Sequence, residues 1–190
     1  MLAWRCLLLL TLLAGIRPAL AEPAAWAALR QDGAIALMRH ADAPGGFGDP
    51  PGFRLEDCAT QRNLSAKGRA EAERVGAALR RERIAIGKLL SSPWCRCMDT
   101  ARLMGMGAVE TAPAFSNVVV LSDRRAELTE AGRAVLRDWK GPGVLLVVTH
   151  GANIQALTGG QNPASGEIVV VRVASDGAVR GFGRLPVPQG

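Results

Sequence analysis

Two short runs of aliphatic residues stand out along the chain, and each is followed by a histidine. Residues 35–38 lead into Arg39 and His40, and residues 144–149 lead into His150. Short apolar runs rich in β-branched residues predict buried strands of a parallel sheet. Ligands of open α/β sheets bind at the carboxyl ends of the strands. We therefore expect the only two histidines of the chain to face one crevice.

The remaining apolar positions predict helices alternating with strands. A helix is expected after Ser65, a favourable N-cap, because apolar residues then recur at helical spacing. A second helix start is predicted at Ser92 as N-cap, with Pro93 at the first helical position. Helices are also expected over residues 122–139 and 151–157, and strands over residues 34–38, 87–90, around 110, 143–149, 167–174 and 178–184.

This order of elements predicts one layered α/β domain with a mostly parallel central sheet. The last two strands are joined by Ser175-Asp176-Gly177, which favours a C-terminal antiparallel hairpin. Residues 41–63 are rich in glycine and proline and interrupt the pattern, so we expect a flap over a site at the sheet edge.

The N-terminus has the pattern of a secretory signal peptide. Arg5 precedes an apolar stretch, and Ala19-Leu20-Ala21 fits a small-x-small cleavage site. We expect residues 1–21 to be removed and residues 22–190 to form the single mature domain, in the periplasm or secreted. The apolar stretch is shorter than the roughly 20 residues that span a bilayer, so stable membrane insertion is not expected, although an uncleaved anchor is the alternative.

Composition excludes several other classes of protein. The net charge is +6, but the chain has no tyrosine, only 4% aromatic residues and no lysine-rich run, so nucleic acid is not an expected partner. Gly46-Phe47-Gly48 is not followed by Gly-Lys-Ser/Thr, so it is not a phosphate-binding loop. Three cysteines remain after cleavage, and Cys58 is expected to pair with Cys95 or with Cys97. No Cys-x5-Arg motif supports a catalytic thiol.

Arginine beside histidine favours an anion over a metal. The guanidinium of Arg39 repels a cation next to His40 but can grip phosphate through parallel hydrogen bonds. Arg96 is expected in the first turn of its helix, where free N–H groups also favour an anion. Two histidines do not complete the ligand set that zinc favours, so neither a metal nor another cofactor is expected.

Four motifs together resemble the histidine phosphatase superfamily, which includes phosphoglycerate-mutase-like enzymes. They are, in order, Leu37-Met38-Arg39-His40-Ala41, Asn63-Leu64-Ser65-x-x-Gly68, Ser91-Ser92-Pro93-x-x-Arg96-x-x-x-Thr100-Ala101 and Val148-Thr149-His150-Gly151. The resemblance covers most of the mature chain and implies a three-layer sandwich with a phosphoryl-transfer pocket. It carries over Arg39, His40, Arg96 and His150.

The implied reaction agrees with the chemistry of these residue types. A neutral His40 would attack phosphorus in line and form a phosphohistidine, which water then hydrolyses. Arg39, Arg96 and a protonated His150 would hold the phosphoryl oxygens as their charge develops.

The general acid is the weakest point of the pattern. In this superfamily a carboxylic acid usually protonates the leaving group, but Gly151 follows the second histidine where the acid-phosphatase branch has an aspartate, and residues 112–121 contain no glutamate. Glu167 is the first candidate and Asp42 the second. Asn153 is a candidate for binding substrate or a nearby loop, with a helix N-cap as the alternative.

Three hypotheses follow from the sequence. The first is an exported phosphatase that hydrolyses small or envelope-associated phosphate monoesters. The second is a degenerate member that binds phosphate without turnover, which the missing acid motivates. The third is a metal-binding or thiol-redox protein of the envelope, which the residues around the histidines disfavour.

Overall fold

The computed structural model describes residues 21–46 and 48–189. Its centre is a six-stranded sheet of order β3-β2-β4-β1-β5-β6. Strands β1 to β4 run parallel, whereas β5 is antiparallel to both β1 and β6. The predicted mostly parallel sheet with a C-terminal hairpin is therefore confirmed. The strands are β1 (Ile35–Arg39), β2 (Ile86–Ser91), β3 (Val109–Thr111), β4 (Val144–Thr149), β5 (Ile168–Val173) and β6 (Val179–Leu185).

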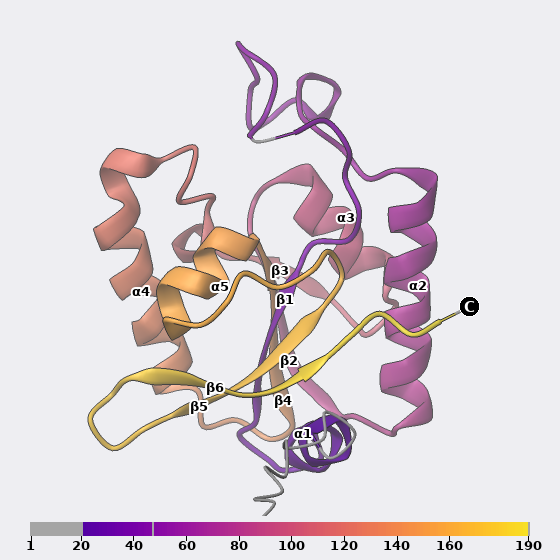
Figure 1. Cartoon of the computed structure of the whole chain (residues 1–190), viewed down its shortest axis with the longest axis vertical. Helices are drawn as coiled ribbons and strands as arrows, with labels where there is room; N and C mark the ends of the chain where they lie inside the picture. The colour runs from indigo at the N-terminus through magenta and orange to yellow at the C-terminus, as the bar shows by residue number, and fades with distance from the viewer. Residues whose placement is uncertain (1–20, 47, 190) are drawn as a thin grey trace, which may run out of the picture.

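Helices cover both faces of this sheet and complete a three-layer sandwich (Figure 1). One buried cluster contains residues of α1, α2 and α3, and the other contains residues of α4 and α5. The α-helices are α1 (Ala21–Leu29), α2 (Ala66–Arg81), α3 (Cys95–Leu103), α4 (Arg125–Asp138) and α5 (Gly151–Thr158); short 3-10 turns are η2 (Cys58–Thr60), η3 (Pro113–Phe115) and η4 (Ser122–Arg124).

Alternation along the strands decides which side chains meet each helical layer. In β1, Ala36 and Met38 pack with α1 to α3, whereas Ile35 and Leu37 pack with α4 and α5. All six residues of β4 are buried, as expected for a central strand covered on both faces. The residue after β1 therefore continues the face of Met38, which directs His40 toward the α3 side.

The start of α3 differs from the predicted start. Its N-cap is Trp94, two residues later than Ser92. The backbone of Ser92 continues the hydrogen bonding of the sheet, because its N–H donates to the Val148 carbonyl. Its hydroxyl contacts a histidine and does not cap the helix. Arg96 nevertheless lies in the first turn, as expected.

The described part of the N-terminal region begins with helix α1. Residues 1–20 of the predicted signal segment lie outside the described part of the chain. Helix α1 was not predicted from the sequence, and it buries Ala25 and Leu29 against the sheet. Within the described residues, no helix is long and apolar enough to span a membrane.

Close packing of α2 on α3 requires glycine at position 76. A Cβ atom there would lie 1.9 Å from the Met104 carbonyl oxygen. Gly76→Ala is therefore expected to lower the free energy of unfolding by about 1–3 kcal/mol, although alanine is the better helix former. Urea unfolding measures this effect, with Ala77→Ser at the exposed neighbour as the control. Equal stability of Gly76→Ala and wild-type protein would contradict the close approach.

Candidate active site

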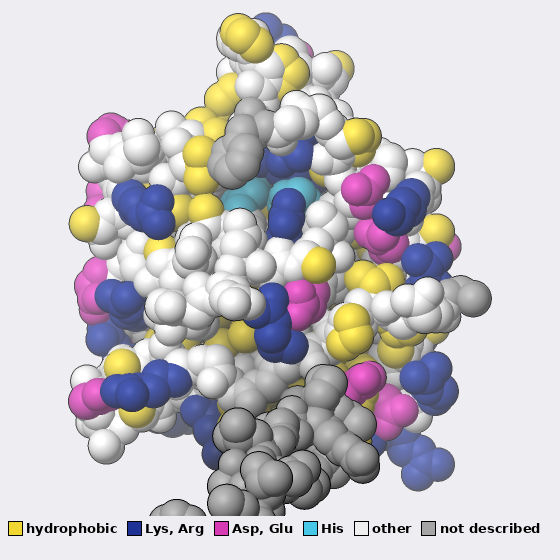
Figure 2. All heavy atoms as spheres, in the orientation of Figure 1, with side chains coloured by type: hydrophobic (Ala, Val, Ile, Leu, Met, Phe, Trp, Pro, Cys, Tyr) yellow, Lys and Arg dark blue, Asp and Glu magenta, His cyan; other side chains and the backbone are white. Residues whose placement is uncertain are grey.

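The two histidines meet at the carboxyl edge of the sheet. β1 and β4 are parallel neighbours in which Arg39 pairs with Thr149, so His40 and His150 follow equivalent positions. Their ring centroids are 5.6 Å apart, and the rings lie edge to face. In Figure 2 small parts of both imidazoles are visible, with Lys or Arg side chains beside them. The expectation that both face one crevice is confirmed.

The Nε2 atom of His40 has no hydrogen-bond partner among the described residues. Its Nδ1 lies 2.8 Å from the Ala41 carbonyl oxygen, an acceptor, so Nδ1 carries the proton of the neutral ring. Burial, together with the charges of nearby arginines, lowers the pKa of His40 to about 3. His40 is therefore a neutral imidazole with an available lone pair on Nε2 at physiological pH.

His150 is more deeply enclosed and is neutral as well. Its Nε2 lies 3.0 Å from the Ser92 hydroxyl, and its ring packs against Trp94 with centroids 5.5 Å apart. Burial first, then the proximity of His40 and arginines, holds the pKa of His150 well below its ordinary value. The expected protonation of His150 concerns the site with a bound phosphoryl group and stays a prediction. A bound phosphate dianion would favour its protonation.

Three arginines surround the imidazoles. Arg39 donates from NH1 to the Pro163 carbonyl at 2.9 Å, and Arg62 donates to the Ala43 carbonyl at 2.5 Å. Arg96 is fully buried. The Nε atoms of Arg62 and Arg96 are buried without a hydrogen-bond partner among the described residues. Unpaired buried N–H donors are costly, so an anionic acceptor would stabilise this cluster.

One carboxylate, Asp49, compensates part of this charge. Its oxygens accept from Arg96 NH1 at 2.6 Å and NH2 at 3.3 Å, from Trp94 Nε1 at 2.9 Å and from the Arg62 backbone N–H at 3.1 Å. These bonds and the charge of Arg96 outweigh burial and lower the pKa of Asp49. Asp49 is therefore an anion that holds the fork of Arg96 in place.

A cavity of about 90 Å³ opens beside both histidines. Its lining includes Arg39, Arg62 and the first two residues of α5, Gly151 and Ala152. The amide groups of those two residues have no acceptor within the helix, which adds to the positive potential. Among the described lining residues there is no carboxylate.

Residues 35–117 match the family model described as histidine phosphatase superfamily (branch 1). The resemblance to the histidine phosphatase superfamily is confirmed. No curated protein matches the chain by sequence. The match includes β1, α2 and α3, and hence His40, Arg62 and Arg96.

Solved structures of several phosphatases share this fold. The protein histidine phosphatase SixA complexed with tungstate superposes with a TM-score of 0.52 at 21% identity, over 80% of this chain and 96% of that one. The alpha-ribazole phosphatase from Shigella flexneri gives 0.59 at 14% identity, over 83% and 98%. A mycobacterial glucosyl-3-phosphoglycerate phosphatase with inorganic phosphate gives 0.55 at 15% identity, over 78% and 93%.

Glu167 does not line the cavity. Its carboxylate pairs with Arg184, with Nε to Oε1 at 2.5 Å, and accepts from the Ala164 backbone N–H at 2.7 Å. These bonds outweigh burial and lower the pKa of Glu167, so the group is ionised at neutral pH. The expectation that Glu167 is the general acid is not supported, because it faces away from His40 and holds no proton.

Asp42 is also engaged elsewhere. Its carboxylate accepts from the Ser65 hydroxyl at 2.6 Å, where Ser65 caps α2 by accepting from Gly68. The Asp42 backbone also bonds the Glu71 carboxylate and the Ser65 backbone. Asp42 therefore anchors the start of α2 and, like Glu167, does not line the cavity.

Asn153 is buried and binds a loop rather than the cavity. Its Nδ2 donates to the Ser116 carbonyl at 2.7 Å, and its Oδ1 accepts from the Val118 N–H at 3.3 Å. Of the roles expected for Asn153, the structure supports binding of the loop, and His150 rather than Asn153 is the N-cap of α5. This loop in turn brings Asn117 to the cavity.

Sequence reasoning missed Arg62, Asp49, Asn117 and Asn162. Arg62 had a signal, since it directly precedes the motif Asn63-Leu64-Ser65. The other three lie in irregular segments without periodicity, so their side-chain positions could not be inferred locally. The described residues do not bring three His, Cys, Asp or Glu side chains together as a metal site would.

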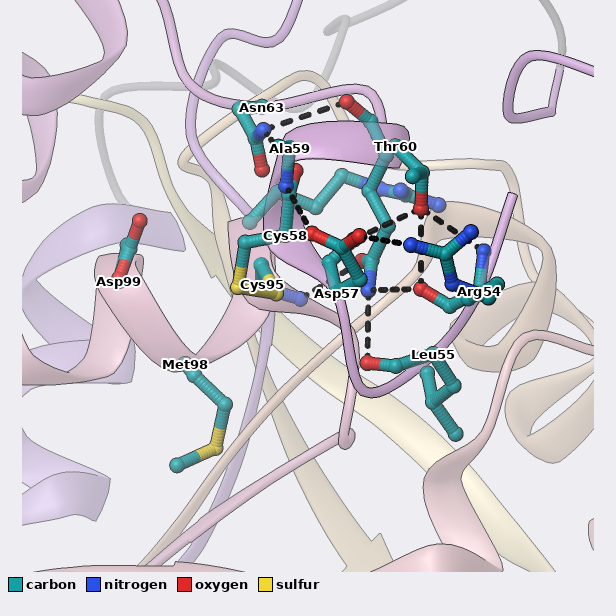
Figure 3. The surroundings of a disulfide bond; sticks show 12 residues. Arg54, Leu55, Asp57, Cys58, Ala59, Thr60, Asn63, Cys95, Met98 and Asp99 are labelled. Carbon is teal, nitrogen blue, oxygen red and sulfur yellow. Dashed lines mark hydrogen bonds and ion pairs between the residues drawn. A yellow bond between two sulfur atoms is a disulfide. The ribbon is translucent and has the colours of Figure 1, made fainter.

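A disulfide between Cys58 and Cys95 ties η2 to the first residue of α3 (Figure 3). The side-chain oxygen of Gln61 also accepts a hydrogen bond from the Cys95 N–H at 3.0 Å. Cys97 is left as a buried free thiol, with Sγ 3.7 Å from His150 Nε2, and burial raises its pKa to about 12. The structure thus selects Cys95 from the two partners that the sequence left open, and Arg96 stands directly beside it.

The double variant Cys58→Ser/Cys95→Ser is expected to lower the free energy of unfolding by about 2–4 kcal/mol, because the loop is no longer closed in the unfolded chain. Chemical denaturation with and without a reductant measures this. Reductant should destabilise the wild-type protein and leave the double variant unchanged. Equal midpoints for the oxidised wild-type protein and the double variant would contradict this role.

Stability is expected to depend on the histidines in mildly acidic solution. Both have lowered pKa values in the folded protein, so the unfolded chain binds protons first, below its ordinary pKa of 6.5. Their stabilising contribution is complete above that pH and declines toward pH 5, by at most about 1.4 kcal/mol per pH unit for each histidine. Urea unfolding over this range tests the slope, which His40→Gln should reduce. A variant slope equal to that of wild type would count against the assignment.

Proposed function

We propose that this protein is a phosphatase that hydrolyses phosphate monoesters through a phosphohistidine on His40. The observation that carries the proposal is the neutral His40, whose free Nε2 borders a cavity lined by Arg39 and Arg62. Nucleophile and cationic donors are thereby positioned before the substrate arrives, which is the main requirement of phosphoryl transfer.

The reaction takes place in two displacements. His40 Nε2 donates its lone pair to phosphorus, and the P–O bond to the alcohol breaks with its electron pair on the leaving oxygen. Water then attacks the phosphohistidine, the P–N bond returns its pair to His40, and phosphate leaves. Arg39, Arg62 and the N–H groups at the start of α5 stabilise the phosphoryl oxygens, while Arg96 adds its charge and its free Nε from behind the cavity.

Leaving-group chemistry is expected to limit the substrates. No carboxylic acid lines the cavity in the described residues, and Glu167 is ionised and paired. Esters, acyl phosphates or phosphoramidates whose leaving group departs without strong acid catalysis are the favoured class. The fold similarity to a protein histidine phosphatase supports considering phosphoramidates among them.

We also propose that the chain is exported. The predicted signal peptide motivates this, and the Cys58–Cys95 disulfide supports an oxidising compartment. A periplasmic or secreted location is the resulting proposal, with a small or envelope-associated phosphate monoester as substrate.

A phosphate-binding protein without turnover is the second candidate. It is favoured by the absence of a carboxylic acid at the cavity and by the pairing of Arg96 with Asp49 in the site without an anion. The intact His40 and its free Nε2 favour the phosphatase.

Hydrolysis of p-nitrophenyl phosphate by the purified protein, with and without EDTA, tests the proposal. Turnover should be insensitive to the chelator and should fall to background in His40→Ala. Arg62→Ala should lower kcat/KM by about 10²-fold or more, because it removes a donor to the developing charge. The control Arg54→Ala, in the same loop but exposed and paired with Asp57, should have no effect. A folded protein that binds phosphate but does not turn over this substrate would favour the second candidate.

A further inference from the structure

Two carboxamides stand at the cavity where an acid would be expected. Asn117 and Asn162 both line it. Asn117 Oδ1 accepts from the Val119 N–H at 3.0 Å. Asn162 is exposed, and its side chain makes no hydrogen bond to another described residue. His40 and His150 are only 3% and 4% exposed, so Asn162 marks the outer side of the site and the histidines mark its floor.

Asn162 occupies the space that a side chain at position 151 would fill. A Cβ atom on Gly151 would lie 1.9 Å from Asn162 Oδ1 and 3.1 Å from its Nδ2. Since Gly151 directly follows His150, its lack of a side chain admits the carboxamide to the edge of the catalytic histidine pair.

The backbone holds Asn162 in this place. Gly159 ends α5 in the left-handed conformation, with φ of 68°, and turns the chain back toward the cavity. Pro163 restricts residue 162 to extended conformations, and its carbonyl accepts from Arg39 at 2.9 Å. The Gly166 N–H then bonds the carbonyl oxygens of Arg39 and His40, each at 3.2 Å. The residues that follow Asn162 are thus hydrogen-bonded to Arg39 and His40.

We propose that Asn162 is the residue that contacts the leaving group, through donation from Nδ2–H to the departing atom. This inference rests on the phosphatase function proposed above. In-line attack from His40 on the cavity floor directs the leaving group outward, to the side where Asn162 lies. As the P–O bond breaks, the carboxamide stabilises the negative charge on the leaving oxygen by a hydrogen bond without transferring a proton, and the oxygen takes its proton from water.

This role defines the preferred substrates further. A carboxamide donor stabilises a leaving anion but cannot protonate it, so it suffices for leaving atoms that depart as stable anions, such as phenolates, carboxylates or phosphate, and not for alkoxides. Inorganic phosphate also places an oxygen at the leaving-group position, so the dependence of the rate on leaving-group pKa, and not phosphate affinity, is the distinguishing readout.

The test compares kcat/KM for a series of aryl phosphates with leaving groups of increasing pKa. This parameter reports the steps up to His40 phosphorylation, in which the leaving group departs. Asn162→Ala should lower kcat/KM about threefold to tenfold for the poorest leaving group, the effect of one hydrogen bond, and less for p-nitrophenyl phosphate. The rate should therefore depend more steeply on leaving-group pKa.

A double-mutant cycle separates this role from simple packing. Gly151→Ala should give the same steeper dependence by displacing the carboxamide, and should add little in the Asn162→Ala background, where the space is empty. The control Gln161→Ala, at the exposed neighbour outside the cavity lining, should match wild type.

The outcomes are distinct. An unchanged leaving-group dependence in an active Asn162→Ala enzyme would overturn this inference and leave the phosphatase intact. A uniform loss across all leaving groups would assign Asn162 to the phosphoryl group instead and would also overturn it. Absence of wild-type turnover, or full turnover in His40→Ala, would overturn the proposed function and this inference with it.

Discussion

The buried ion pair between Arg96 and Asp49 is the interaction on which the site depends. Both side chains are fully buried, so removal of either would leave an uncompensated charge at a cost of about 3–5 kcal/mol. Asp49 comes from the irregular segment and Arg96 from the first turn of α3, so their pairing fastens the segment to the sheet edge. The same carboxylate accepts from the Arg62 backbone and thereby positions a second guanidinium. Together with the disulfide one residue from Arg96, it converts a glycine- and proline-rich segment into one wall of the cavity.

Strand and helix periodicity predicted the framework of the site well. The two apolar runs before His40 and His150 are parallel neighbours in register, which is why their imidazoles meet. Ser65 caps its helix as predicted because capping is local. Ser92 does not, because its backbone bonds Val148 and its hydroxyl bonds His150, two partners distant in sequence.

The place of the Glu167 carboxylate could not be predicted because it depends on sheet register. Ile168 pairs with Met38 and shares its face, so the preceding residue, Glu167, presents its carboxylate to the opposite face from His40. Only the pairing of β5 with β1 shows on which face of the sheet each residue lies. Asp49 and Asn162 were missed for a related reason: their partners are far away in the chain, and irregular segments carry no periodic signal that would connect them.

The lining of the cavity has a consequence for the kind of phosphate that the proposed reaction would accept. Its walls are guanidinium and amide donors, with buried imidazoles at the floor. A monoester presents three non-bridging oxygens to those walls and one substituent to the opening. A diester would have to turn its second substituent toward the buried donors, leaving them without an acceptor. Under the proposed function, chain-like phosphodiesters, including nucleic acid backbones and intact phospholipid linkages, are therefore expected to be poor substrates because of the polarity of the phosphoryl site itself.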